Sequence, residues 1–295
     1  MLIDNESRMS RSGLLIGVGL LALATAALGS TEPRTEPSTA RGKIAVYDNT
    51  RTVVIVSAAT GRVVSKIQSD SIAGTGDLSP DGSWIAVETY PNPKGLVVQP
   101  LAGGRVRTVA RCSANWCPGW PSWDGTGSQL AYQQGPFIYI VFANGLGRTR
   151  VIRGETPDWS PGTPEIAFMR DFSDYTGAGK IYVAAIDGHD LRYLARGAYP
   201  SFHPSGKRLV FVRGPDIFTV SAAGGTPRRI IRNGFAPVWS PDGRFIAFSR
   251  FTTCPKPPAH GVCSGRIFIL PASGTGTARP VGPEIGDIGR ISWGG

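Results

Sequence analysis

The sequence predicts an all-β fold, a six-bladed β-propeller made of four-stranded antiparallel blades. Three observations lead to this prediction. The 295 residues include 39 Gly and 24 Pro without a Gly-X-Y period, a composition that argues against a helical bundle, a coiled coil or collagen. One strand-turn-strand motif recurs along the chain, and the two ends of the chain carry complementary pieces of it.

An apolar run, residues 13–28, follows two arginines near the start of the chain and precedes a polar Thr/Glu/Pro-rich stretch. This order is typical of a secretory leader, and the run is shorter than the about 20 residues that span a membrane. We therefore interpret residues 1–29 as a signal peptide or an uncleaved membrane anchor that starts at Met1 or Met9, and residues 30–41 as a polar linker. The remainder is expected to be exported to the periplasm, the cell envelope or the medium.

A repeated motif begins after the linker. Its first copy, Asp77 to Val87, reads DLSPDGSWIAV. The proline of Ser-Pro-Asp-Gly presets φ for a β-turn and the glycine accepts a positive φ, so the motif predicts a tight turn between two strands. Each copy has a large apolar side chain before the turn, which we call its anchor: Leu78, Trp123, Trp159, Phe202 and Trp239.

A second turn follows each copy at a glycine. These glycines are Gly104, Gly145, Gly188, Gly225 and Gly274. Each lies between two further apolar runs, so each unit contains four strands joined as a meander. A four-stranded unit of about 40 residues that repeats around an axis is a propeller blade.

The sixth unit is divided between the two ends of the chain. Residues 43–67 contain its second, third and fourth strands, and residues 291–293 contain its first. We therefore expect Ile291 to Trp293 to pair beside Ile44 to Val46 and to close six blades within residues 42–295. Without this pairing the chain would leave an open sheet edge.

The complete turn Trp-Ser-Pro-Asp-Gly followed by Ile-Ala-Phe, at Trp239 to Phe248, resembles the WD40-like repeat of the TolB-like six-bladed propeller family. The resemblance extends over nearly all of residues 42–295. It implies the same closed propeller. It says less about function, because propellers support many unrelated functions on one scaffold.

The four cysteines form two local pairs, Cys112 with Cys117 and Cys254 with Cys263. Pairs of this kind in Pro-rich loops suit an oxidising compartment, so we expect two disulfides. Free thiols and a metal site are the alternatives. A zinc site would need closer Cys spacing or histidine partners, so we expect no metal.

The net charge of +10 is spread along the whole chain and comes mostly from arginine. Such a distribution is more typical of a solvated surface than of a nucleic-acid site. We expect a monomer that requires no cofactor and binds a protein or peptide, with an envelope glycan as a further option. Membrane contact is expected only through the N-terminal segment, if that segment stays uncleaved.

The loops of such a propeller divide between two ends. We call the end with the Ser-Pro-Asp-Gly and glycine turns the turn face, and the opposite end, with the longer and more varied loops, the loop face. Binding residues concentrate on long loops. We therefore expect the loop face to bind the ligand.

Arginines occupy one repeat position near the loop face in three consecutive blades, at Arg170, Arg213 and Arg250. Aromatic residues enter the innermost strands nearby, at Trp120, Tyr199 and Phe235. These six side chains predict a site for an anionic or carboxylate-bearing partner. In the alternative interpretation each arginine caps its own strand or pairs with a neighbouring acid such as Asp171 or Asp216.

Asp171 and Asp174 are two closely spaced carboxylates in a long loop of the loop face, and we include them in the candidate site. The three histidines have no carboxylate at a helpful spacing for acid-base catalysis, and no Gly-x-Ser-x-Gly motif occurs. A non-catalytic binding protein is therefore the first hypothesis. The alternative is a propeller hydrolase or lyase acting on a peptide or glycan, with Asp77 and Asp158 on the innermost strands.

Overall fold

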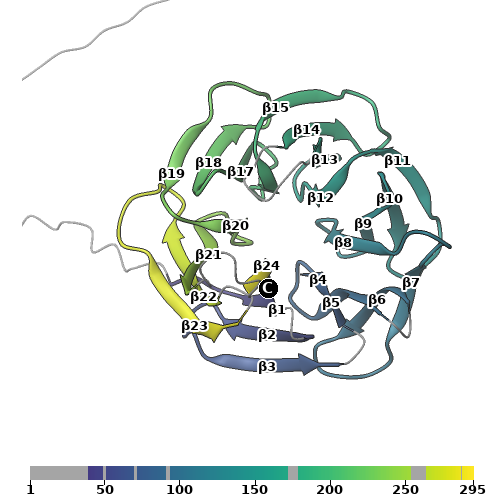
Figure 1. Cartoon of the computed structure of the whole chain (residues 1–295), viewed down its shortest axis with the longest axis horizontal. Coiled ribbons are helices and arrows are strands. Elements are labelled where there is room, and N and C mark those ends of the chain that lie inside the picture. The colour runs from purple at the N-terminus through teal and green to yellow at the C-terminus, as the bar shows by residue number, and fades with distance from the viewer. Residues whose placement is uncertain are drawn as a thin grey trace, which may run out of the picture. The chain divides into compact units, whose positions relative to one another are not determined.

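The computed structural model describes residues 39–48, 51–69, 72–90, 94–171, 179–253, 264–286 and 288–295, all within one compact unit, Thr39–Gly295. These residues form 24 strands in six four-stranded antiparallel sheets, arranged as blades around a central axis (Figure 1). The predicted all-β propeller is confirmed. No helix long and apolar enough to cross a membrane occurs in the described ranges.

The blades follow one another in chain order, each from its innermost to its outermost strand. Blade 1 contains β24 (Ile288–Gly294), β1 (Lys43–Asp48), β2 (Thr52–Ser57) and β3 (Val63–Gln68). Blade 2 contains β4 (Ile72–Leu78), β5 (Trp84–Thr89), β6 (Gly95–Pro100) and β7 (Arg107–Arg111). Blade 3 contains β8 (Pro118–Trp123), β9 (Gln129–Gln134), β10 (Phe137–Phe142) and β11 (Thr149–Arg153). Blade 4 contains β12 (Glu155–Trp159), β13 (Glu165–Arg170), β14 (Lys180–Ala185) and β15 (Arg192–Arg196). Blade 5 contains β16 (Ala198–Phe202), β17 (Arg208–Arg213), β18 (Asp216–Ser221) and β19 (Arg228–Ile231). Blade 6 contains β20 (Phe235–Trp239), β21 (Phe245–Thr253), β22 (Ser264–Pro271) and β23 (Arg279–Ile285).

Blade 1 is built from both ends of the chain, as predicted. Strand β24 pairs antiparallel with β1, with Ile44 opposite Trp293 and Val46 opposite Ile291. The indole Nε1 of Trp293 donates a hydrogen bond to the carbonyl oxygen of Arg41 at 2.7 Å. Ile291 and Trp293 also pack in a cluster that joins blades 1 and 6, so the pairing closes the ring.

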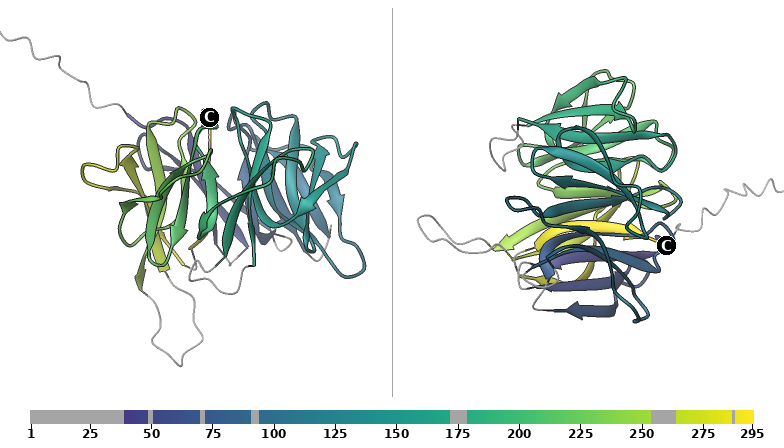
Figure 2. Two further views of the ribbon diagram at one scale, coloured as in Figure 1. Left: turned by 90° about the horizontal axis from the view of Figure 1, so that it is seen from above. Right: turned by 90° about the vertical axis from the view of Figure 1, so that its right-hand side faces the viewer.

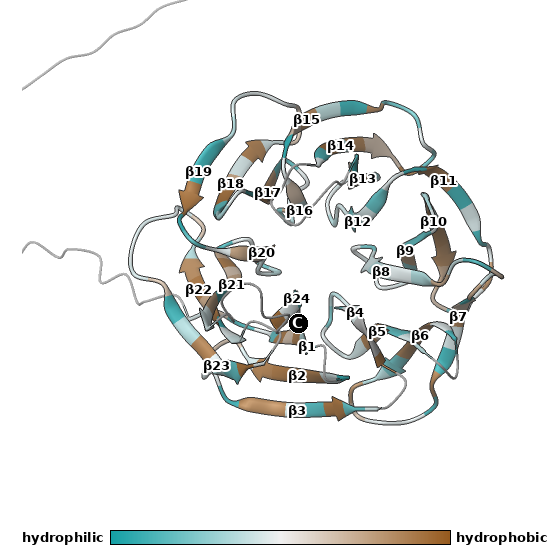
Figure 3. Ribbon diagram, in the orientation of Figure 1, coloured by the Kyte–Doolittle hydropathy of each residue, from teal (hydrophilic) through white to brown (hydrophobic). Residues whose placement is uncertain are grey.

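The hydrophobic core lies between neighbouring blades. The middle strands are buried along most of their length, as in β2, which is hydrophobic over most of its residues (Figure 3). The outermost strands are half-exposed, as in β3. The anchor Trp159 of blade 4 packs with Ile138 of blade 3 in one cluster, so the repeated anchors seal the contact between adjacent blades.

The Ser-Pro-Asp-Gly turns have the geometry that their residues predict. In blade 2 the amide of Gly82 donates to the carbonyl of Ser79 at 2.8 Å, and Gly82 has φ +64°. The Ser79 hydroxyl and the Ser83 amide both donate to the Asp81 carboxylate, at 2.5 and 3.0 Å. These bonds hold the pKa of Asp81 below its ordinary value.

The short turns and the C-terminus lie at the same end of the ring, the turn face (Figure 2). Gly295 donates to the carbonyl of Pro80 at 2.8 Å, which ties the C-terminus to the first turn of blade 2. At the opposite end, the disulfide between Cys112 and Cys117 closes the loop between blades 2 and 3, as predicted. Cys254 and Cys263 lie outside the described residues.

Candidate functional site

Four adjacent blades share a strained residue on the innermost strand, three positions before the anchor and directly before a proline. These residues have left-handed backbones and are Trp120 (φ +53°), Thr156 (φ +46°), Tyr199 (φ +52°) and Ala236 (φ +46°). The pairing of each strand with its neighbour shifts register at this point. A bulge of this kind re-aims a side chain, and such strain is common at functional sites.

Three of these bulges are held by side chains of the preceding blade. The amide of Trp120 donates to Thr75 Oγ1 at 3.0 Å, and the amide of Thr156 donates to Gln133 Oε1 at 3.1 Å. The amide of Tyr199 contacts the sulfur of Met169 at 3.1 Å. The neighbouring blade therefore satisfies each displaced backbone donor and maintains the bulge.

The bulges bring the predicted aromatic residues together at the loop-face end of the channel. Ring centroids are 5.8 Å apart between Trp120 and Tyr199, 4.9 Å between Tyr199 and Phe235, and 5.6 Å between Phe235 and Phe251. We call these four residues the aromatic row. Arg290, on β24, lies 5.7 Å over the ring of Trp120 and donates to the carbonyl of Pro121 at 3.0 Å.

Two cavities adjoin the aromatic row. A groove of about 840 Å³ is lined by Phe235, Phe251, Arg232 and Arg250 among others. A pocket of about 30 Å³, large enough for one water molecule, lies among residues that include Trp120, Tyr199 and Thr156. The Thr156 hydroxyl is buried and has no hydrogen-bond partner among the described residues.

Deeper in the channel, the residue before an anchor accepts a hydrogen bond from the anchor amide of the next blade. The four bonds run from Leu78 to Ser292 (3.1 Å), from Trp123 to Asp77 (2.9 Å), from Trp159 to Ser122 (2.9 Å) and from Phe202 to Asp158 (2.7 Å). We call this arrangement the belt. It links blades 1 to 5 around the axis.

The two carboxyl groups of the belt line a cavity of about 330 Å³ that opens among the turns of the turn face. Burial raises the pKa of Asp77 to about 6, although Arg290 and the Trp123 amide lower it. Burial also raises the pKa of Asp158 to about 7, against the Phe202 amide and Arg290. Both carboxyls therefore hold a proton to a higher pH than an exposed aspartate does.

The predicted arginines lie away from the channel axis and bridge blades. The Nε groups of Arg170, Arg213 and Arg250 each donate to the carbonyl oxygen 17 residues earlier, on Arg153, Arg196 and Asn233, at 2.9, 2.9 and 3.0 Å. Each guanidinium also lies over two aromatic rings of its own blade. Among the described residues no ion pair joins them to Asp171 or Asp216, although the charge of Arg170 helps to lower the pKa of Asp171, and ligand binding by these arginines stays a prediction.

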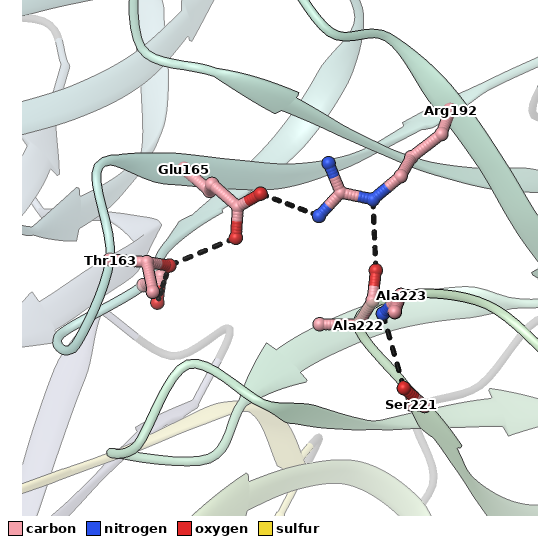
Figure 4. A network of polar contacts seen from close by, with 7 residues as sticks. Thr163, Glu165, Arg192, Ser221, Ala222 and Ala223 are labelled. Atoms are coloured by element: carbon pink, nitrogen blue, oxygen red, sulfur yellow. Dashed lines mark hydrogen bonds and ion pairs between the residues drawn. The ribbon is translucent and has the colours of Figure 1, made fainter.

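A second set of arginines bridges blades on the turn face. Arg192 of blade 4 donates to Glu165 Oε1 at 2.5 Å and to the carbonyl of Ala222 in blade 5 at 2.9 Å (Figure 4). Arg279 of blade 6 donates in the same way to Ala58 of blade 1 at 2.8 Å. The high arginine content therefore serves the contacts between blades in part.

The remaining predicted acidic residues are not grouped into a site. Asp171 forms a surface ion pair with Lys180 at 2.7 Å, which lowers the pKa of Asp171. Asp216 pairs with Arg229. Asp174 lies outside the described residues, and within the described ranges no group of three or more His, Cys, Asp or Glu side chains is placed to hold a metal ion.

Two contributors to the site were missed in the sequence. Arg290 lies three positions before the last anchor, and Thr156 occupies the bulge of blade 4. The signal that marks the bulges in the sequence is a proline two residues before the anchor. The bulged residue directly precedes this proline at Trp120, Thr156, Tyr199 and Ala236.

No protein-family model and no curated protein sequence matches this chain. Solved structures do match. TolB from Acinetobacter baumannii aligns with a TM-score of 0.65 and 16% identity over 85% of this chain, which spans 66% of that protein, just under two thirds. A putative TolB from Agrobacterium tumefaciens aligns with a TM-score of 0.59 and 18% identity over 85% of this chain and 91% of its own. The fold of this chain is therefore that of a TolB-like six-bladed β-propeller.

Proposed function

We propose that the chain is an exported, non-catalytic, monomeric propeller that binds an extended segment of a protein or peptide through its loop face. The aromatic row carries this proposal. Its four rings run from the channel to Phe251, which is 47% exposed. Aromatic side chains supply large contact areas at a low cost in conformational entropy, so they dominate binding at many interfaces.

The groove beside the row favours a ligand that carries both apolar and carboxylate groups. Phe235 and Phe251 line it together with Arg232 and Arg250. The Nε and one terminal nitrogen of Arg250 already donate to backbone carbonyls, so the guanidinium is held in a fixed orientation. A preorganised guanidinium binds a carboxylate with little further loss of entropy.

Export is supported by two features that do not depend on the groove. The apolar run of residues 13–28 has the order of a secretory leader. The Cys112–Cys117 disulfide fits an oxidising compartment outside the cytoplasm.

The binding function is tested by selecting peptides from a random linear library on the immobilised full chain. Selected peptides should be rich in aromatic or aliphatic residues and contain a carboxylate. Trp120→Ala and Phe235→Ala should each weaken their binding by at least about tenfold. Soluble peptidoglycan fragments, added as competitors, test the alternative of an envelope glycan.

Tyr193→Ala is the control, because Tyr193 is an exposed aromatic residue on the outer strand β15, away from the aromatic row. Selected peptides that bind Trp120→Ala and Phe235→Ala as tightly as the parent chain would contradict the proposal. The Arg170→Ala, Arg213→Ala, Arg250→Ala triple variant tests the predicted arginine site, because loss of salt-sensitive binding beyond any loss of stability would support it.

A hydrolase or lyase remains the second candidate, because Asp77 and Asp158 line one cavity and have raised pKa values near 6 and 7. Paired carboxyls with raised pKa values can serve as a general acid and a general base. Chromogenic glycosides and peptides provide the test. Turnover that Asp158→Asn abolishes would favour the enzyme.

A further inference from the structure

We infer that the second turns of blades 1 to 3, on the turn face, form a surface that docks against an anionic lipid membrane. The surface consists of basic side chains interleaved with exposed apolar ones. Its members are Arg62, Val63, Val64, Lys66, Arg105, Val106, Phe142 and Leu146. We call it the basic-apolar arc. It lies at the end of the ring opposite the aromatic row and does not depend on the proposed peptide binding.

The apolar members of the arc recur close to the second turn of each blade. Val64 is 52% exposed in blade 1, Val106 is 47% exposed in blade 2, and Leu146 is 67% exposed in blade 3. Each lies within three residues of a second-turn glycine. Exposed apolar residues scattered singly need no explanation, but a recurrence in three neighbouring blades indicates a common partner.

The arc carries positive charge and no negative charge. Residues 58–66 and 101–107 each contain Arg or Lys, and residues 58–66, 101–107 and 142–150 contain neither Asp nor Glu. In the part of the chain that the structure describes, Arg62 and Arg105 take part in no ion pair. Their charges therefore remain available to an anionic surface.

The basic-apolar arc does not extend to blades 4 to 6, because their second turns differ from it in composition. The second turn of blade 4 has an exposed apolar residue, Leu191, but also two exposed acidic residues, Asp187 and Asp190. The corresponding turns of blades 5 and 6 contain Gly, Thr, Ser, Ala and Pro without a large exposed apolar side chain. Only one side of the turn face therefore combines both properties.

The chain enters the propeller beside this arc. The amide of Ala58, in the second turn of blade 1, donates to the carbonyl of Gly42 at 3.0 Å. The 38 residues that precede Thr39 include the apolar run 13–28. Stable membrane association usually needs two signals, such as an apolar segment and a basic patch, and this chain has a candidate for each. A lipid surface therefore fits the arc better than a protein partner does.

The test uses the full chain with Leu146→Cys labelled by the polarity-sensitive dye NBD, reconstituted into vesicles of phosphatidylcholine alone or with 30% phosphatidylglycerol. The parent chain treated with the same dye gives the background. We expect a blue shift of the emission with the anionic vesicles and little shift with the neutral ones. Arg62→Glu with Arg105→Glu should lower the ratio of docked to undocked protein by about tenfold or more, because each basic residue contributes on the order of 1 kcal/mol near such a surface.

Arg111→Glu with Arg196→Glu is the matched control, since it reverses two exposed charges at the loop-face ends of β7 and β15. This variant should dock as the parent chain does. The inference is overturned if the emission of NBD at position 146 stays that of an aqueous environment with anionic vesicles, or if both charge-reversal pairs change docking to the same extent. It is also overturned if the dye responds to a protein extract free of lipid and not to vesicles.

Discussion

The two ends of each innermost strand behave differently. At the turn-face end the anchors repeat, the Ser-Pro-Asp-Gly turns repeat, and the belt joins one blade to the next through similar bonds. At the loop-face end the backbone is strained in four blades, and the side chains at the bulge differ: Trp120, Thr156, Tyr199 and Ala236. A bulge with the same side chain in every blade would stabilise the ring equally well.

The difference separates stability from function. Positions that repeat are those that every blade needs for packing against its neighbour. Positions that keep the same strained backbone and change the side chain gain nothing in stability, because a left-handed non-glycine residue costs about 1 to 3 kcal/mol. We therefore assign the anchor end to the fold and the bulge end to the ligand, and the following experiments test that division.

Deletion of residues 289–295 should have the largest effect, because it removes most of β24. Strand β1 would lose its inner partner, and Ile291 and Trp293 would leave the cluster between blades 1 and 6. We expect either no cooperative unfolding transition or a fall of Tm by more than about 10 °C, measured by circular dichroism. An added Gly-Ser tail after Gly295 is the control, and a deletion variant as stable as the tailed chain would show that the ring closes without β24.

Two tryptophan variants compare the ends directly. Trp159, an anchor, is 6% exposed and packs between blades 3 and 4, so Trp159→Ala should lower the free energy of unfolding by about 3 to 5 kcal/mol. Trp120→Ala at the bulge should cost much less stability and should abolish tight peptide binding. Denaturant unfolding and peptide titration of both variants make the comparison. Equal losses of stability would erase the distinction between the two ends.

The anchor end was predictable from the sequence and the bulge end only in part. The anchors, the turns and the closure by Ile291 to Trp293 follow from a local repeat, because each depends on turn chemistry and apolar spacing. The aromatic row depends on where bulges place Trp120 and Tyr199, which is a contact between blades about 80 residues apart in the chain. The roles of Arg170 and its counterparts were not predictable for the same reason, since each bonds to a backbone carbonyl of another blade.

Asp158→Asn tests the belt through its pH dependence. The pKa of Asp158 is raised to about 7 from an ordinary value near 4, so between these pH values the folded chain binds more protons than the unfolded chain. This carboxyl therefore stabilises the fold least at high pH, and its contribution declines as pH rises from about 4 to about 7. The variant keeps an oxygen to accept the Phe202 amide, and it should gain roughly 2 to 4 kcal/mol relative to the parent chain between pH 4 and pH 8.

Asp81→Asn is the control of opposite sign. The pKa of Asp81 is lowered by its serine partners, so its contribution is present above the ordinary pKa and is lost as pH falls. Denaturant unfolding at several pH values measures both variants. A difference between Asp158→Asn and the parent chain that does not change with pH would refute the raised pKa of Asp158.

Thr156→Gly should have the smallest effect on stability, and the direction of that effect distinguishes a role in the fold from a role in binding. Thr156 combines a β-branched side chain at φ +46° with a buried hydroxyl that has no partner in the described part of the chain. Glycine adopts this backbone without steric strain and removes the hydroxyl, although it loses more entropy on folding, so we expect a net gain of about 0.5 to 1 kcal/mol in the free energy of unfolding. A loss of stability would instead assign Thr156 to the fold. Because Thr156 lines the pocket among Trp120 and Tyr199, weaker peptide binding by the stabilised variant would show that this bulge is retained for the ligand at the expense of the ring.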